Sequence, residues 1–247
     1  MTWHTDRMCG FDLETTGVDV ETDRIVTACV VQCGGGQPTA SATWLANPGV
    51  EIPAGAAAIH GITTAQAQAE GDPAAEVVEQ LVAALAQAQR DSIPIVAMNA
   101  RFDLTILDRE ARRHGITPLV DIIGSDDLRV IDPMVIDKQM SRRRGKRTLV
   151  DLCEFYRVPI GDAHTADADA IAACRVAWAL HQRYAQLQRA DVRGLHLLQI
   201  GWAADQASSF RAYLRGRQEW DRAKTVHGEW PWIPVDAPEP EAEGATA

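Results

Sequence analysis

The order of strand-like and helix-like segments limits this chain to a small set of folds. The first segments are apolar and β-branched and are separated by turn residues, whereas later ones alternate between short apolar runs and longer stretches of helical periodicity. This order is typical of a mixed α/β sheet, with three antiparallel strands followed by parallel ones and flanked by helices. The expected strands are 7–14, 25–33, 39–45, 93–98 and 130–132, and the expected helices are 73–90, 103–114, 148–156, 165–188 and 195–220.

Composition divides the chain further. We expect an α/β domain over 1–190, a helical C-terminal extension over 191–234 and a disordered acidic tail over 235–247. The tail is rich in Pro, Glu and Ala and carries four acidic residues and no basic one, a composition that cannot build a core. Trp178 and Trp202 fall in helical patterns, where packing is expected. Trp220, Trp230 and Trp232 lie in the extension, where they either cover the domain or contact a partner.

Charge and cysteine usage exclude several classes of protein. The net charge of −10 excludes a strongly basic surface that grips nucleic acid over a long footprint. The sequence holds no apolar run of about 18 residues, so no membrane partner is expected. Its first ten residues lack the apolar stretch of a signal peptide. Five cysteines without a CxxC pair predict neither a disulfide framework nor a zinc site, and we expect a cytoplasmic protein.

Two carboxylates interrupt the first predicted strand, in the segment FDLETTG at 11–17. Side chains alternate along a strand, so Asp12 and Glu14 project from one face while Phe11 and Leu13 face the core. Adjacent carboxylates repel each other and need a cation or a proton at neutral pH. A hard divalent metal with oxygen ligands meets this need. The alternative is an exposed strand end with two solvated acids.

Two later segments place further acids at the starts of helices. NARFD at 99–103 follows a predicted strand, and ligand sites gather at the carboxyl ends of strands in α/β sheets. HTADAD at 164–169 opens the long helix that Thr165 is expected to cap. Each has a simpler explanation, because carboxylates in a first helical turn interact favourably with the helix dipole.

Together, the three segments, in this order and about 90 and 60 residues apart, resemble the motifs of the DEDDh (DnaQ-like) exonucleases. That family includes the proofreading subunit of bacterial replicative polymerase. The resemblance covers roughly 7–184, and IHGIT at 59–63, read as a loop, looks like a segment of the proofreading-type branch. It implies an RNase H-like fold, with a five-stranded mixed sheet flanked by helices.

The resemblance also assigns roles to residues. It implies that two Mg²⁺ or Mn²⁺ ions are held by Asp12, Glu14, Asp103 and Asp169. Asp169 is preferred over Asp167 because the family spaces its last Asp five positions after its His. By the same resemblance, His164 is the general base. The implied reaction is 3′→5′ removal of nucleoside 5′-monophosphates from DNA ends, in which two metals stabilise the attacking and leaving oxygens.

Substrate contacts are expected around these acids. By the resemblance, Thr15 and Thr16 support the terminal nucleotide. Asn99 contacts either the substrate or the Asp103 loop, Phe102 is either core or a stacking platform, and His60 either packs its loop or faces the substrate. The basic run 142–147 is either a solvated loop or a phosphate-contacting one, the latter through Arg142, Arg143 and Arg144.

Three other functions remain open from the sequence. In the first, the enzyme trims RNA or oligoribonucleotides instead of single-stranded or frayed DNA 3′ ends. In the second, the protein is chiefly a subunit of a DNA polymerase or repair complex. The third is a metal-free scaffold of the same fold, and the complete set of acids with His164 argues against it. The ETTG and IHGIT matches favour the proofreading-type DNA branch.

Overall fold

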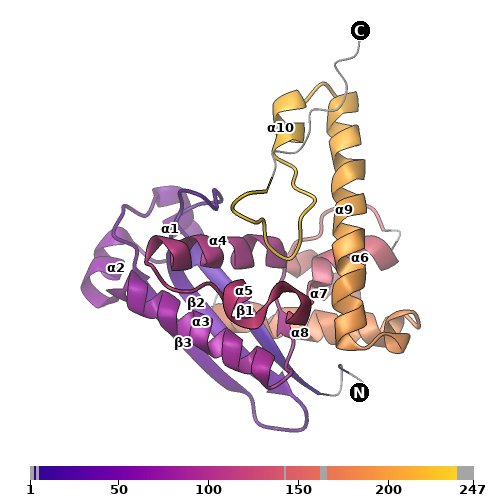
Figure 1. Ribbon diagram of the computed structural model, residues 1–247, viewed down its shortest axis with the longest axis horizontal. Helices are drawn as coiled ribbons and strands as arrows, with labels where there is room; N and C mark the ends of the chain where they lie inside the picture. The colour runs from indigo at the N-terminus through magenta and orange to yellow at the C-terminus, as the bar shows by residue number, and fades with distance from the viewer. Residues whose placement is uncertain (1–2, 4–5, 142, 162–165, 238–247) are drawn as a thin grey trace.

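A computed structural model describes residue 3 and residues 6–141, 143–161 and 166–237 (Figure 1). Its centre is a sheet with the strand order β4-β3-β2-β1-β5-β6. The antiparallel strands are β1 (Arg7–Thr15), β2 (Ile25–Gly34) and β3 (Ala40–Asn47). Two short strands lie beyond β1. Strand β5 (Ile95–Val96) runs parallel to β1, and β6 (Val130–Ile131) runs parallel to β5.

The sheet has six strands among the described residues, so the prediction of five was wrong by one. The additional strand is β4 (Asp72–Pro73), which pairs with the end of β3. Two residues are too few to show the alternation from which a strand is recognised in a sequence. The mixed α/β architecture itself is confirmed.

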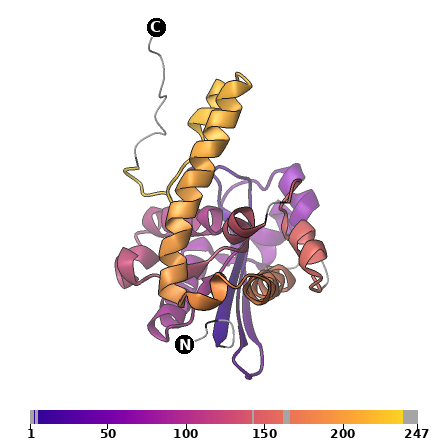
Figure 2. The same cartoon turned by 90° about the vertical axis from the view of Figure 1, so that its right-hand side faces the viewer.

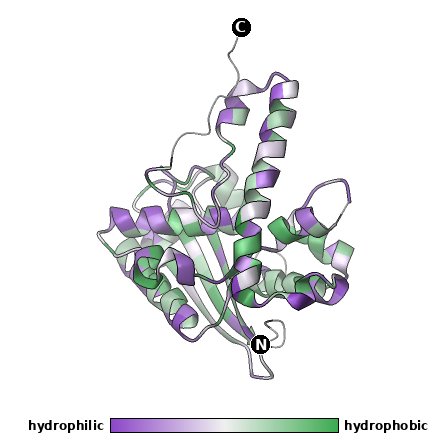
Figure 3. Cartoon of the chain, turned by 45° about the vertical axis from the view of Figure 1, so that its right-hand side comes forward, coloured by the Kyte–Doolittle hydropathy of each residue, from purple (hydrophilic) through white to green (hydrophobic). Residues whose placement is uncertain are grey.

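Helices cover both faces of the sheet, and the central strands carry many hydrophobic residues (Figure 3). One core lies between the sheet and α3 (Ala74–Arg90), α4 (Ala100–Arg113) and α5 (Leu119–Ile123). The other lies between the sheet and α6 (Pro133–Met140), α7 (Leu149–Tyr156) and α8 (Ala166–Arg183). Thr148 caps α7 with its side chain, as its position before the apolar run favours.

Some predicted boundaries were wrong. The segment 59–61, expected as a loop, ends α1 (Ala54–His60), which is followed by α2 (Thr64–Glu70). The alanines of α1 have high helix propensity and extend the helix to His60. The helix expected over 195–220 is α9 (Val192–Gly216), and α10 (Trp220–Lys224) follows it. Short 3₁₀ turns lie at η1 (Ser125–Asp127) and η2 (Leu187–Arg189).

Helix α9 packs against β6, the edge strand of the sheet. It then runs on beyond the body of the molecule (Figures 1 and 2). The Gln199 side chain accepts a hydrogen bond from the Asp132 amide (2.7 Å) and donates one to the Val130 carbonyl (2.9 Å). His196 Nδ1 accepts one from the Val130 amide (3.2 Å). Burial lowers the pKa of His196 to about 4, so the ring stays neutral and can accept. Side chains of α9 therefore satisfy the backbone groups that an edge strand leaves unpaired.

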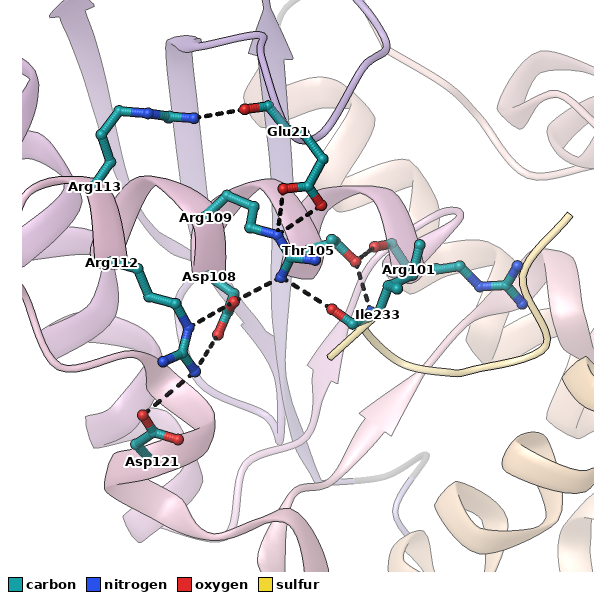
Figure 4. A network of polar contacts seen from close by, with 9 residues as sticks. All are labelled: Glu21, Arg101, Thr105, Asp108, Arg109, Arg112, Arg113, Asp121 and Ile233. Carbon is teal, nitrogen blue, oxygen red and sulfur yellow. Dashed lines mark hydrogen bonds and ion pairs between the residues drawn. The ribbon is translucent and has the colours of Figure 1, made fainter. Parts of the chain in front are cut away.

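The chain after α10 folds back onto the outer face of α4 (Figure 4). The Ile233 amide donates to Thr105 Oγ1 (3.0 Å), and Arg109 donates to the Ile233 carbonyl (3.0 Å) as well as to Glu21 (2.8 Å). Trp230 is buried and Trp232 packs against the core beside α4, so these two tryptophans cover the domain.

The other tryptophans differ in their surroundings. Trp202 packs against both cores, as expected. The packing expected for Trp178 was wrong, because its side chain is 47% exposed on α8, and Trp220 is also exposed. Among the described residues, none of the helices combines the length and apolar character that a membrane crossing requires.

Helix α8 crosses β1 at Gly10, where the two backbones approach closely. A Cβ at this position would lie 2.7 Å from the Ala170 carbonyl oxygen and 3.0 Å from Cys174 Sγ. Ala170 directly follows Asp169, so this contact sets the distance between Asp169 and β1.

We expect Gly10→Ala to lower the free energy of unfolding by about 1–3 kcal/mol, because the added methyl group overpacks a backbone contact. Urea unfolding measures the change. Gly201→Ala is the matched control, since a Cβ there on the exposed face of α9 meets no atom within 4 Å. The control should be neutral or stabilising by up to about 1 kcal/mol. Equal stabilities of the two variants would contradict the close approach.

Candidate active site

Strand β1 carries two of the acids on the face that α8 covers. Asp12 pairs with Cys29 of β2 and Glu14 with Thr27, and the register shifts directly after Glu14. Phe11 and Leu13 are buried in the core on the opposite face, together with α3 and α4. The alternation expected from the sequence therefore places both carboxylates on one side, near the end of the ladder.

Helix α8 adds a third acid from its first turn. Carboxylate oxygens of Asp12, Glu14 and Asp169 all lie within 4.8 Å of one another, and the three residues are each half-buried. They come from two elements that meet at Gly10, so the close packing described above brings Asp169 to β1.

Asp103 joins this cluster from the first turn of α4. Its side chain is 5% exposed, and burial raises the pKa of its carboxyl well above the usual value. The backbone amides of Asp103 and Leu13 oppose this rise, while the negative charges of Asp132 and Glu14 add to it. The pKa of Asp12 is likewise raised, first by burial and then by Asp103, Glu14 and Asp169. The four acids thus form one electrostatically coupled group, here called the carboxylate cluster.

The carboxylate cluster has the chemistry of a site for hard divalent cations. Its donors are carboxylate oxygens only, the ligands that Mg²⁺ and Mn²⁺ prefer. Burying several carboxylates together is costly unless a proton or a cation offsets their charge. The donor set therefore fits a metal.

Asp132 is a site residue that the sequence interpretation missed. Its buried carboxylate accepts hydrogen bonds from the amides of Asn99 (3.2 Å) and Ala100 (3.0 Å), in the turn that leads into α4 and Asp103. Asn99 adopts a left-handed conformation there (φ 63°). Asp132 also caps α6 through the Met134 amide (2.9 Å). The signal is an Asp directly before a Pro, a helix N-terminus pattern; the sequence interpretation of 130–132 as a strand leading into the next helix gives Asp132 no role in the site.

The structure places the residues that were expected near the substrate in different surroundings. His60 lies beside Thr15: burial lowers the pKa of its ring, and a backbone hydrogen bond with Thr15 opposes this. The His60 Nδ1 atom accepts from the Ile62 amide (3.2 Å). Thr16, in contrast, is buried and donates to Asp23 (2.7 Å). Phe102 is half-buried against the α3–α4 core.

The basic run is partly used within the fold. Arg143 donates to the buried carboxylate of Asp137 (3.1 Å), as do Arg147 (2.7 Å) and the Tyr156 hydroxyl (2.6 Å). Arg144 is exposed. Arg142 and His164 lie outside the described residues.

Solved structures share this fold, and a curated protein is similar in sequence. DNA polymerase III PolC-type from Lacticaseibacillus paracasei is 28% identical over 177 residues, which cover 72% of this chain and 11% of that protein. The structure of E. coli exonuclease I in complex with a dT13 oligonucleotide aligns with a TM-score of 0.58 at 19% identity, covering 74% of this chain and 42% of that one. Exonuclease I from Methylocaldum szegediense aligns with a TM-score of 0.59 at 21% identity and the same coverage. This chain thus spans under half the length of each.

The family model of the exonucleases (RNase_T) matches residues 9–177, which run from β1 through most of α8. This segment contains all four acids of the carboxylate cluster, while α9 and the segment after it lie outside the match. Since the matched segment makes up well over half of the sequence, the chain belongs to the exonuclease family.

Proposed function

We propose that this protein is a metal-dependent 3′→5′ exonuclease that removes nucleoside 5′-monophosphates from DNA 3′ ends. The observation that carries the proposal is the carboxylate cluster, in which oxygens of Asp12, Glu14 and Asp169 lie within 4.8 Å of one another. Its place in a chain of the exonuclease family supports nuclease chemistry.

The four acids of the cluster would hold two Mg²⁺ or Mn²⁺ ions. When bound, such ions supply a nucleophile at neutral pH and stabilise the charge on the leaving oxygen. Asp132 fixes the turn that presents Asp103. We assign His164 as the general base, because an imidazole titrates near neutrality and can accept the proton of the attacking water.

Contacts to the terminal nucleotide are proposed for residues beside β1 and α4. Thr15 and His60 lie next to each other there, and exposed Asn99 lies at the start of α4. The hydroxyl of Thr16 donates to Asp23 (2.7 Å) and its amide donates to the Arg24 carbonyl (2.9 Å), so neither group is free for the substrate. Phe102 remains a candidate for stacking through the part of its ring that is not buried. Arg144 and Arg142 would contact phosphates without reading sequence, whereas Arg143 donates through Nη1 to the Lys146 carbonyl (2.8 Å) and has its Nη2 buried.

A second candidate is that the protein works as a subunit beside a DNA polymerase, as a proofreading or repair exonuclease. The likeness to a protein named DNA polymerase III PolC-type favours this candidate. Co-elution with a purified replicative polymerase on size-exclusion chromatography would support this candidate. Separate elution would favour an enzyme that acts without the polymerase.

The proposed activity is tested with three 5′-labelled oligonucleotides of one sequence: single-stranded DNA, duplex DNA with a 3′-terminal mismatch, and RNA. Stepwise shortening of the labelled strand in Mg²⁺ or Mn²⁺, and none in EDTA, is the expected result for both DNA substrates. Immediate release of the label would contradict the 3′→5′ polarity. Faster degradation of RNA than of either DNA would identify RNA as the substrate. Absence of degradation of all three oligonucleotides would reject the proposal.

A further inference from the structure

A groove lies between the start of α4, helix α6, helix α9 and the segment that follows α10. Its volume is about 640 Å³, within the range of about 300–1,000 Å³ that is usual for ligand sites. The lining includes Asn99, Arg101, Lys138, Phe210, Tyr213 and Trp230. We propose that this groove binds a single nucleic-acid strand, namely the nucleotides that precede the one held at the carboxylate cluster. The inference rests on the proposed nuclease function.

The position of the groove connects it to the cluster. Asn99 and Asp132 line it, and their hydrogen bond belongs to the turn that presents Asp103. Asn99 lies four residues before Asp103, a rise of about 6 Å along a helix. A strand whose end is held at Asp103 therefore reaches the groove within about the length of one nucleotide.

The charges of the groove suit a phosphate backbone. Its cations are Arg101, Lys138 and Arg147, of which Arg147 is paired with Asp137 (2.7 Å). Its acids are Asp205 and the buried Asp132, whose carboxylate accepts from backbone amides. Exposed Lys138 forms no hydrogen bond or ion pair with any residue that the structure describes.

Arg101 is a second cation with unused hydrogen-bonding capacity. It donates through one nitrogen to the His227 carbonyl (2.6 Å), while its buried Nε has no partner within the described part of the chain. Lys138 and Arg101 thus offer charged donors whose hydrogen-bonding capacity the described part of the chain does not fully use, although Asp132 lies near both. Such donors favour a strand with phosphate oxygens over an apolar protein segment as the occupant.

Two aromatic rings on α9 supply stacking surfaces beside these cations. Phe210 is 44% exposed and Tyr213 57% exposed, and their rings lie nearly parallel, 6.3 Å apart between centroids and 13° between planes. Every base has a π-face, so aromatic platforms next to cations are the usual means of binding single strands without sequence preference. Helix α9, which forms this wall of the groove, lies outside the family match.

The groove is tested with two probes, a 5′-fluorescein dT12 oligonucleotide and the dinucleotide pdTpdT, which is too short to extend from the cluster into the groove. Binding of dT12 is measured by fluorescence anisotropy in EDTA, and hydrolysis of pdTpdT is measured in Mg²⁺. We expect Phe210→Ala and Tyr213→Ala each to raise the Kd for dT12 at least about fivefold. Lys138→Ala should reduce the slope of log K against log salt by about 0.7. All three should hydrolyse pdTpdT at the wild-type rate.

Matched controls come from exposed residues outside the groove. Trp178→Ala removes an exposed aromatic ring from α8, and Arg90→Ala removes an exposed charge from the end of α3. Both should bind dT12 as the wild type does. Phe210→Leu keeps an apolar side chain without the ring, so a similar loss of dT12 binding in this variant excludes misfolding as the cause.

Unchanged dT12 binding in the groove variants, or an equal loss on both probes, would overturn the inference. A wild-type protein that binds dT12 through Phe210 and Lys138 but hydrolyses neither probe would support the groove and reject the proposed function. A wild type that hydrolyses pdTpdT but binds dT12 independently of these residues would reject the groove alone.

Discussion

Asp12→Asn is expected to lower the turnover of single-stranded DNA by about 10³-fold or more and to leave the protein folded. The amide keeps the shape of the side chain but removes a charge from a cluster in which three carboxylates lie within 4.8 Å of one another. A loss of about 4 kcal/mol of transition-state stabilisation, well within what a catalytic metal provides, corresponds to this factor. Initial rates on a 5′-labelled oligonucleotide measure the effect.

Glu79→Gln is the matched control for this substitution, because it makes the same change of charge on an exposed face of α3. It should retain the wild-type rate. Thermal unfolding of Asp12→Asn in EDTA should occur at or above the wild-type temperature, since the substitution relieves repulsion from Asp103, Glu14 and Asp169. Turnover within tenfold of the wild type would contradict the proposed role of Asp12 as a metal ligand.

The second large effect concerns stability without a divalent metal. Burial and mutual repulsion raise the pKa of both Asp12 and Asp103 above the value of about 3.9 for an unfolded chain. The folded state therefore holds these protons more tightly than the unfolded state does. This contribution is fully present below about pH 4 and is lost as the pH rises through the raised pKa values. Each tenfold difference in proton affinity corresponds to about 1.4 kcal/mol.

Urea unfolding in EDTA at pH 5, 7 and 8.5 should show this loss as a difference between the wild type and Asp103→Asn. The comparison is needed because exposed acids with a lowered pKa, such as Asp19 and Asp151, act in the opposite direction in both proteins. At neutral pH, Mn²⁺ at about 100 times its Kd should stabilise the wild type by about 2.7 kcal/mol. A pH dependence identical in the two proteins, or no effect of Mn²⁺, would contradict a coupled cluster that binds metal.

The parts of the site that the sequence predicted follow from local periodicity. Because side chains alternate along a strand, the faces of Phe11 and Leu13 and of Asp12 and Glu14 were readable from seven residues. The rule that ligand sites gather at the ends of strands made Asp103 a candidate, and the family resemblance gave it the role of a metal ligand. Asp169 was chosen over Asp167 only through the family resemblance, since both acids stand in the same first helical turn.

The parts that were missed depend on contacts between distant segments. Gln199 meets Val130 across 69 positions of sequence, and the indole of Trp230 meets Asp132 across 98. No local pattern encodes such pairs. The same holds for side chains with two plausible partners: Thr16 and Arg143 were expected to face the substrate, whereas Asp23 and Asp137 engage their polar groups.

The cover that α9 places over β6 has a consequence for the autonomy of the exonuclease unit. The family match ends at residue 177, before Gln199 and His196 supply their hydrogen bonds to the edge strand. A chain shortened to the matched segment would expose the unpaired edge of the two-residue strand β6 and the apolar surface beside it. Such an edge is a template on which further strands add, so the shortened protein would self-associate. Helix α9 is therefore a solubility element of the nuclease unit as well as a wall of its groove.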